Sequence, residues 1–453
     1  MKTKKIFLMV FMVAVLVVLS ACGGNDEQEA ENVTITFYTW WGAAERSMGE
    51  ALVAEFESRN PGITVEQHYI AFSDYLPIIN AQIAANNVPN VFIINEFLVT
   101  EWGEAGIGQD IMPHLNQRGI NPDEFWVETA LYTSGNSIWG INPSVATTVL
   151  FYNKSMFEYY GLRAPSEFSA ANPISWDEFV SSARVLTRDA NGLSPYDDGF
   201  DVNNVVQWGT IMPDSWIYVL PLLYAANTSI ADDSGHNLLL NSDTAIQALQ
   251  NMADLSHVHN AAPVLSLTGS SLLGSFPAML MNEQLGMFVG GTFLNPSFGD
   301  ENFDVGIAQI PSMSGQGNNM AWGAGFMLGD DAPEEAVDFF LFLSDFNNWV
   351  YVSQNTGLTL PGLPQTNSVF TDPELNAAWL EVFDPNLAVV VNDILQNGSR
   401  TAENVTLINF SEILDQNLIP LFDRIWLGDV TAAEGVAEIE QTLSNLLEGA
   451  WGN

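Results

Sequence analysis

The order of hydrophobic and polar residues along the chain predicts an alternation of strands and helices. From 33 to 38, Val, Ile and Phe alternate with Thr and Tyr, as in a strand with one buried face. Met48, Leu52 and Phe56 then recur at helical spacing. The unbroken apolar run 91–94 is typical of a strand buried on both faces of a parallel sheet. The sequence therefore predicts an α/β fold with right-handed crossovers.

The middle of the chain continues this pattern. Mostly hydrophobic stretches predict further strands at 147–152, 286–293 and 305–310. A capping box at 175–178 and an N-cap at Ser242 each predict the start of a helix. The C-terminal third is predicted to be mostly helical, and the sequence contains no internal repeat.

The N-terminal residues have the pattern of a secretory signal. Three lysines precede an apolar stretch at 6–19, which is short for a membrane span of about 20 residues. The stretch ends in Leu-Ser-Ala-Cys, the bacterial lipobox, so we expect a lipoprotein signal peptide at 1–21 and lipidation of Cys22. Residues 22–32 would form a tether. A short membrane helix with an incidental cysteine is the competing interpretation. The predicted location is the extracytoplasmic face of the membrane, anchored by lipid.

Composition restricts the chemistry. Cys22 is the only cysteine, so a lipidated chain would have neither disulfides nor thiol chemistry. The chain carries a net charge of −42, and loss of the three signal lysines would leave nine basic residues against 54 acidic ones, a net of −45. This charge repels nucleic acid and anionic lipid. Hydrophobic residues make up 47% of the chain, so it has the material for folded cores. The charge suits high salt or high pH, where screening shortens repulsion.

Signatures of catalysis, cofactors and metals are not found in the sequence. It has no G-x-S-x-G or H-E-x-x-H motif, and its only lysine after the signal, Lys154, does not follow a glycine-rich loop. His257 and His259 form an H-x-H without an evident third ligand. The acidic stretch 196–201 does not match the EF-hand spacing and is interpreted as a solvated loop. We predict no catalytic residues, no cofactor and no metal.

The tryptophans suggest a sugar site. Several of the 13 stand next to glycine at predicted strand ends or turns: Trp41, Trp139, Trp208 and Trp322. Aromatic rings stack on the apolar face of a pyranose, while Asn, Asp and Glu bind its hydroxyls. Ligands of open α/β sheets lie at the carboxyl ends of strands, where Trp40 and Asn95 are predicted. Trp176 and Trp349 are predicted to be core residues.

Six short stretches in a fixed order carry a family resemblance: 35–41, 88–92, 150–157, 173–179, 286–291 and 356–361. From Val33 to about Leu447 the chain resembles the extracellular solute-binding proteins of ABC importers, the family-1 type that includes sugar and maltodextrin binders. Asn90 stands where this family usually has aspartate, and Phe293 stands where sugar binders often place a tryptophan.

The resemblance implies a two-lobed periplasmic-binding-protein-like fold (type II) with the ligand in the cleft. The N-lobe would comprise 33–142 plus 304–348, and the C-lobe 143–303 plus 349–453. The crossings between lobes would fall near 142–149, near 310–325 and near Trp349.

The resemblance also places ligand-facing residues. By position they are Trp40, Trp41, Asn95, Glu96, Trp208, Trp216, Gly291, Thr292, Phe293, Trp322 and Gly323. Four tryptophans (40, 41, 216 and 322) would stack on the ligand, and Asn95, Glu96 and Thr292 would hydrogen-bond it. Replacing Trp322 by Ala is expected to remove affinity and leave thermal stability near wild type.

The predicted function is a lipid-anchored, monomeric receptor that captures a carbohydrate by hinge closure and delivers it to an ABC permease. Within the binding class, a cationic or zwitterionic solute such as a polyamine or betaine is the alternative ligand, since tryptophans can surround a cation. A surface-anchored glycoside hydrolase, with two carboxylates flanking a cleft, is the alternative from the enzyme class. A structural or adhesive lipoprotein is a third possibility.

Overall fold

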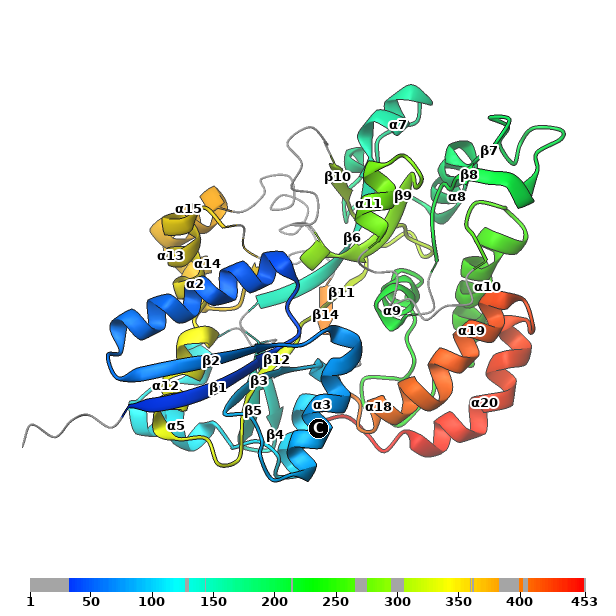
Figure 1. Ribbon diagram of the computed structural model, residues 1–453. Coiled ribbons are helices and arrows are strands. Elements are labelled where there is room, and N and C mark those ends of the chain that lie inside the picture. The colour runs from blue at the N-terminus through cyan, green and yellow to red at the C-terminus, as the bar shows by residue number, and fades with distance from the viewer. Residues whose placement is uncertain are drawn as a thin grey trace, which may run out of the picture.

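The computed structural model describes residues 32–126, 130–142, 144–212, 215–264, 275–294, 305–358, 360, 362–382, 399–401 and 406–451. The predicted signal peptide and Cys22 lie outside the described residues. Figure 1 shows two groups of strands and helices side by side, here called the first lobe (lower left) and the second lobe (upper right). Each lobe is built around its own mixed sheet with helices packed on it, which confirms the predicted α/β fold class.

The first lobe contains a six-stranded sheet in the order β2-β1-β3-β12-β5-β4. Its strands are β1 (Val33–Thr39), β2 (Ile63–Tyr69), β3 (Val91–Ile94), β4 (Leu131–Ser134), β5 (Ser137–Ile141) and β12 (Gly325–Leu328). The first three are parallel, and β12 is antiparallel to β3. Alternate residues of β1 are buried, and all four residues of β3 are buried, as their hydrophobic patterns predict.

Helices of the first lobe pack around this sheet. They are α2 (Ala43–Arg59), α3 (Phe72–Ala84), α4 (Glu96–Glu104), α5 (Met112–Arg118), α6 (Pro122–Phe125), α12 (Glu334–Ser344), α13 (Phe346–Thr356), α14 (Asn367–Thr371) and α15 (Pro373–Val382). Asn90 stands where the resembled family usually has aspartate. Its hydrogen bonds connect β1 to the turn before β3. Its Oδ1 accepts the Thr36 backbone N–H at 2.9 Å, and its own N–H donates to Thr36 Oγ1 at 2.9 Å.

The second lobe is built on the long strand β6 (Ser144–Asn153). Five strands belong to the same sheet: β9 (Met287–Gly291), β10 (Val305–Ala308), β11 (Asn319–Trp322), β13 (Leu363–Pro364) and β14 (Ser399–Thr401). All but β14 pair directly with β6, and nine of its ten residues are buried. The mostly hydrophobic stretch predicted as a strand at 147–152 is therefore the central strand of this lobe.

Helices of the second lobe are α7 (Lys154–Tyr159), α8 (Trp176–Leu186), α9 (Trp216–Ala225), α10 (Asp243–His257), α11 (Phe276–Met281), α19 (Ile419–Leu427) and α20 (Ala432–Leu446). Short elements complete it: η2 (Pro165–Glu167), β7 (Arg188–Asp189), η3 (Val202–Asn204) and β8 (Val205–Gln207). The predicted N-caps are present. Ser175 Oγ accepts the Glu178 N–H at 3.2 Å, and Ser242 Oγ accepts the Ala245 N–H at 3.3 Å.

The chain passes between lobes at positions that differ in part from those expected. The first passage, between β5 and β6, and the second, between β11 and β12, fall inside the expected ranges. The assignment of 304–348 to the N-lobe needs correction, because β10 and β11 both pair with β6. The start expected for the final C-lobe segment, residue 349, is also too early, because α13 packs against α2 and α15 of the first lobe.

The chain also passes between the lobes through helices near the C-terminus. Helix α18 (Phe410–Ile413) contacts α4 of the first lobe, and α19 packs against α10 and α20 of the second. The π-helical turn η6 (Leu414–Leu418) joins α18 to α19. Such turns within α-helices are rare and are frequent at functional sites. This segment appears as the orange helices in Figure 1.

Candidate ligand-binding cleft

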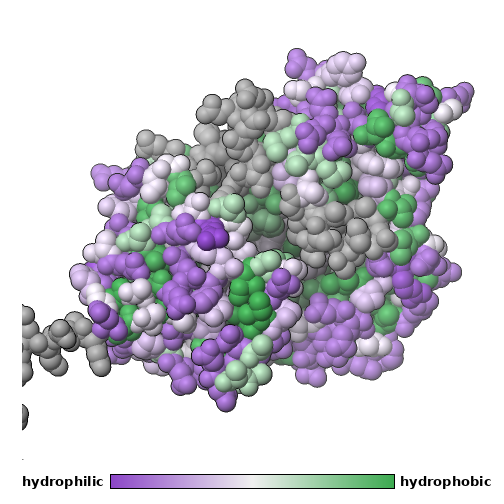
Figure 2. Space-filling model, viewed as in Figure 1, coloured by the Kyte–Doolittle hydropathy of each residue, from purple (hydrophilic) through white to green (hydrophobic). Residues whose placement is uncertain are grey.

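A cavity of about 580 Å³ lies between the two lobes. Figure 2 shows the surface hollowed near the centre of the molecule, with hydrophobic side chains beside the opening. Residues of both lobes and of the passages between them line it: Trp40, Trp41, Glu45, Phe72, Ile93, Asn95, Glu96, Phe97, Asn142, Ser144, Val145, Ala146, Ser215, Trp216, Ile217, Phe293, Trp322, Gly323, Ala324, Phe326, Trp349, Gly362, Leu414, Asp415 and Ile419. Its volume is in the usual range of small-molecule sites.

The wall contributed by the first lobe is formed at the carboxyl ends of β1 and β3. These parallel strands pair through Tyr38 and Phe92, so the residues that follow them lie at one edge of the sheet. Trp40 follows β1 and meets the rings of Phe72 and Tyr75 edge-on, with centroids 5.4 and 5.0 Å apart. Asn95 follows β3. The edge of the sheet thus presents an aromatic ring beside an amide.

Trp41 and Trp349 connect this wall to the core. Their rings meet edge-on at 5.9 Å, and Trp41 also contacts Phe37 at 5.6 Å. Trp349 is 2% exposed, and its Nε1 donates to the Leu343 carbonyl oxygen at 2.7 Å. Trp176 is also buried, so the core placement predicted for both tryptophans is confirmed.

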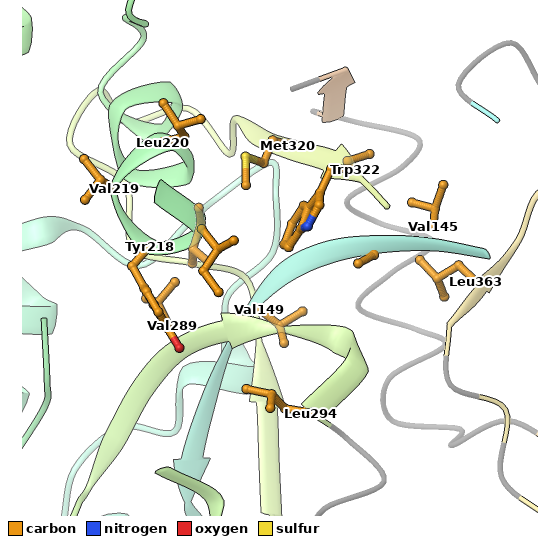
Figure 3. Close-up of a cluster of buried hydrophobic side chains, with 14 of the residues drawn as sticks. Val145, Val149, Tyr218, Val219, Leu220, Val289, Leu294, Met320, Trp322 and Leu363 are labelled. Atoms are coloured by element: carbon orange, nitrogen blue, oxygen red, sulfur yellow. The ribbon is translucent and has the colours of Figure 1, made fainter. Parts of the chain in front are cut away.

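The wall contributed by the second lobe carries another tryptophan pair. Trp216 begins α9 and Trp322 ends β11, and their rings meet at 5.8 Å. Figure 3 shows Trp322 above β6, with Met320 and Val149 nearby. Trp322 is only 7% exposed. Its ring therefore belongs both to the cavity wall and to the core, which differs from the expectation that its replacement leaves thermal stability near wild type.

Eight of the eleven predicted ligand-facing residues line this cavity: Trp40, Trp41, Asn95, Glu96, Trp216, Phe293, Trp322 and Gly323. The other three, Trp208, Gly291 and Thr292, lie outside the lining. Trp208 forms a bridge with Leu285, before the start of β9. Thr292 is 2% exposed, and its Oγ1 accepts the Thr147 N–H at 3.3 Å. Gly291 ends β9 and pairs with Thr148. Residues of a buried strand cannot all face the cleft.

Other lining residues were missed by sequence reasoning. Asn142 directly follows β5, and the sequence places it only in a passage between lobes. Glu45 lies in the first turn of α2, and its acidic character is not distinctive in a chain with 54 acids. Asp415 lies in η6, and a π-turn has no evident sequence signal.

The ionisable groups of the lining are all carboxylates: Glu45, Glu96 and Asp415. Burial raises the pKa of Glu45, although the Gly42 N–H donates to its Oε2 at 3.0 Å. Burial also raises the pKa of Asp415. Since no lysine, arginine or histidine is found among the described lining residues, an anionic ligand would face uncompensated negative charge.

Glu96 also affects a buried tyrosine behind the cavity. Burial, and then the negative charge of Glu96, raise the pKa of Tyr132 well above its ordinary value. Tyr132 therefore stays protonated, and its hydroxyl donates to the carbonyl oxygen of Gly323. This bond fixes the second passage between the lobes at the floor of the cavity.

The acidic loop and the H-x-H pair lie outside the cavity lining. Asp189 precedes the acidic loop in the sequence. Its carboxylate accepts the backbone N–H groups of Asn191 and Leu193, at 2.8 and 2.9 Å, and closes a turn. Asp197 accepts the N–H and hydroxyl of Ser194. His257 Nε2 lies 2.8 Å from the Trp426 carbonyl oxygen. Among the residues that the structure describes, no group of three or more His, Cys, Asp or Glu side chains is placed to hold a metal ion.

Comparison with known proteins gives a family match. The family "Bacterial extracellular solute-binding protein" matches residues 43–345. The arabinooligosaccharide-binding protein of Bacillus subtilis is 22% identical over 264 residues, which are 56% of this chain and 55% of that protein. The chain thus matches little more than half the length of this curated relative.

Solved structures share the fold over nearly the whole chain. An ABC substrate-binding protein from Listeria monocytogenes, in complex with cycloalternan, has a TM-score of 0.76 and 21% identity, covering 91% of this chain and 98% of that one. The maltose/maltodextrin-binding domain from Bdellovibrio bacteriovorus, bound to maltotriose, has a TM-score of 0.70 and 18% identity, covering 91% and 99%. Both relatives are binding proteins. In the described part of this chain, no helix combines the length and apolar character needed to cross a membrane.

Proposed function

Because the chain belongs to the bacterial extracellular solute-binding protein family, we propose that it captures a neutral oligosaccharide in the cleft between its lobes. The observation that carries this proposal is the lining of the cavity, where tryptophans of both lobes face one volume of about 580 Å³ beside amide and carboxylate groups. Rings would stack on the apolar faces of the sugar, and the polar groups would bind its hydroxyls.

The passages of the chain between the lobes support a closure mechanism. Trp40 and Trp41 belong to the first lobe, while Trp216 and Trp322 belong to the second. A ligand that contacts both pairs binds the closed arrangement better than the open one, so it shifts the population toward closure. We propose that an ABC permease recognises the closed, monomeric receptor.

The N-terminal sequence supports anchoring. Cleavage before Cys22 and its acylation would hold the receptor at the extracytoplasmic face of the membrane. Labelling of producing cells with a radioactive fatty acid should mark the wild-type protein and not Cys22→Ser. Equal labelling of both would contradict anchoring through this residue.

A cationic or zwitterionic solute is the second candidate ligand. The three carboxylates of the lining favour it, because a cation would offset their charge in the cavity. A thermal-shift screen of neutral oligosaccharides, polyamines and betaines separates the two ligand classes. A melting midpoint that rises only with polyamines or betaines would support the receptor function but contradict the sugar as its ligand. Release of reducing ends from an oligosaccharide would instead support the hydrolase.

A further inference from the structure

Asn142 has an unsatisfied hydrogen-bond donor at the floor of the cavity. The residue is 1% exposed, and its Nδ2 is buried without a hydrogen-bond partner. Of the described residues that line the cavity, it alone has such an atom. A buried donor left unpaired loses its hydrogen bonds to water without replacement, so it marks a place where a further partner would stabilise the protein.

The orientation of the Asn142 amide is fixed by its surroundings. Its Oδ1 accepts the Ser144 backbone N–H at 3.0 Å, which identifies the oxygen end and leaves the nitrogen end free. Its backbone N–H donates to the Ala130 carbonyl oxygen at 2.8 Å. The donor is therefore held in place before any ligand arrives.

Asn142 also lies where two passages between the lobes meet. It connects β5 to β6, and Gly323 lies between β11 and β12. The two residues are so close that a Cβ on Gly323 would overlap the Asn142 Nδ2. Glycine at 323 leaves room for the amide at the base of the cleft, where side chains of both lobes converge.

We propose that Asn142 Nδ2 donates a hydrogen bond to an oxygen of the bound ligand and thereby selects a polyhydroxylated one. This inference rests on the proposed function and deepens it. The carboxylates of Glu45, Glu96 and Asp415 can only accept hydrogen bonds when ionised, whereas Asn142 supplies a donor. A sugar hydroxyl can accept from Asn142 and donate to a carboxylate. A polyamine has no acceptor oxygen and leaves the Asn142 donor unpaired. A betaine carboxylate can accept from Asn142, but a betaine has no hydroxyl to donate to the carboxylates of the lining.

Replacing Asn142 by Asp tests this role. The variant Asn142→Asp keeps an oxygen for the Ser144 N–H but replaces the donor by a second acceptor. Asn142→Ala removes the amide without adding a buried charge, and serves if Asn142→Asp does not fold. Asn121→Asp is the matched control. Asn121 is exposed, lies outside the cavity lining, and accepts the N–H of Asp123, two residues later, at 3.3 Å in the same way.

The probes are maltotriose, mannotriose and arabinotriose, and the one that binds wild type most tightly is titrated into each variant by calorimetry. Circular dichroism and melting curves verify folding. We expect Asn142→Asp and Asn142→Ala to bind at least about tenfold more weakly, and Asn121→Asp to bind like wild type. Affinities of both Asn142 variants within twofold of wild type would overturn this inference and leave the proposed function standing. No binding of any trisaccharide to wild type would overturn both.

Discussion

The indole rings of Trp216 and Trp322 meet edge to face, with centroids 5.8 Å apart and planes at 75°. Trp322 is 7% exposed, whereas Trp216, the first residue of α9, is only half-buried. The pair links the packing of the second lobe to the cavity surface. Movement of either ring would therefore alter both the wall and its support.

Replacing each tryptophan of this pair should separate its contribution to stability from its contribution to ligand binding. Trp322→Ala is expected to lower the free energy of unfolding by about 3–5 kcal/mol, because it leaves a cavity in the core, and to weaken binding as well. Trp216→Ala should weaken binding with a smaller loss of stability. Urea unfolding and ligand titration measure the two effects. Wild-type stability of Trp322→Ala would contradict its placement between β6 and α9.

Substitutions at Gly209 and Gly323 should have different effects, because Gly209 packs in the fold and Gly323 lies in the cavity lining. A Cβ at Gly209 would overlap the backbone carbonyl of Ala183 in α8, and backbone cannot move aside easily. Gly209→Ala should therefore lower the melting temperature strongly, while the folded fraction keeps its affinity. Gly323→Ala should displace the Asn142 amide and weaken binding. The opposite distribution of the two effects would contradict the placement of the site.

Burial of Glu45 predicts a pH-dependent stability. Its pKa in the folded protein is raised, so its contribution is fully favourable below the unfolded pKa and is lost as pH rises through the folded pKa. Glu45→Gln keeps an oxygen for the Gly42 N–H and removes the ionisation. The variant should be more stable than wild type at neutral pH, with the difference shrinking toward pH 4. Melting curves at constant ionic strength measure this.

Glu434 gives the matched control with the opposite sign. The N–H and hydroxyl of Thr431 lower its pKa, so its contribution is present above the unfolded pKa and is lost as pH falls. Glu434→Gln should be less stable than wild type at neutral pH and approach it in acid. Parallel pH profiles for the two variants would show that the assigned environments are wrong.

The dependence on salt should distinguish charge repulsion within the protein from the charge of the ligand. With a net charge of −42, self-repulsion destabilises the compact state, and screening shortens to about 3 Å at 1 M salt. The melting temperature should rise with added sodium chloride. Affinity for a neutral sugar should change little over the same range, whereas affinity for a polyamine would fall steeply. Stability that is independent of salt would count against the repulsion.

The sequence predicts the first half of the cleft well, and the reason is local. Alternation in β1 and the apolar run of β3 identify two strands, and parallel pairing then brings Trp40 and Asn95 to one edge. In contrast, β10 and β11 are short buried strands, and their sequences carry no information about which lobe they join. Their pairing with β6 depends on the tertiary fold.

The remaining parts of the site depend on arrangements without a sequence pattern. The helical periodicity of the C-terminal third does not reveal the π-turn that places Asp415 in the lining. The space around the unpaired donor of Asn142 depends on Gly323, which lies 181 positions later in the sequence. Position along the chain places Trp208, Gly291 and Thr292 near the cleft, but it does not specify the direction of a side chain.

The central claim is that the cleft binds a neutral oligosaccharide, and a direct titration tests it best. The soluble chain from Asn25 onward would be titrated with maltotriose, mannotriose and arabinotriose while tryptophan fluorescence is recorded. We expect at least one sugar to give a saturable change, with the melting midpoint rising in parallel, because tryptophans of both lobes line the cavity. No response to any of the three, together with a saturable response to a polyamine or betaine, would contradict the account.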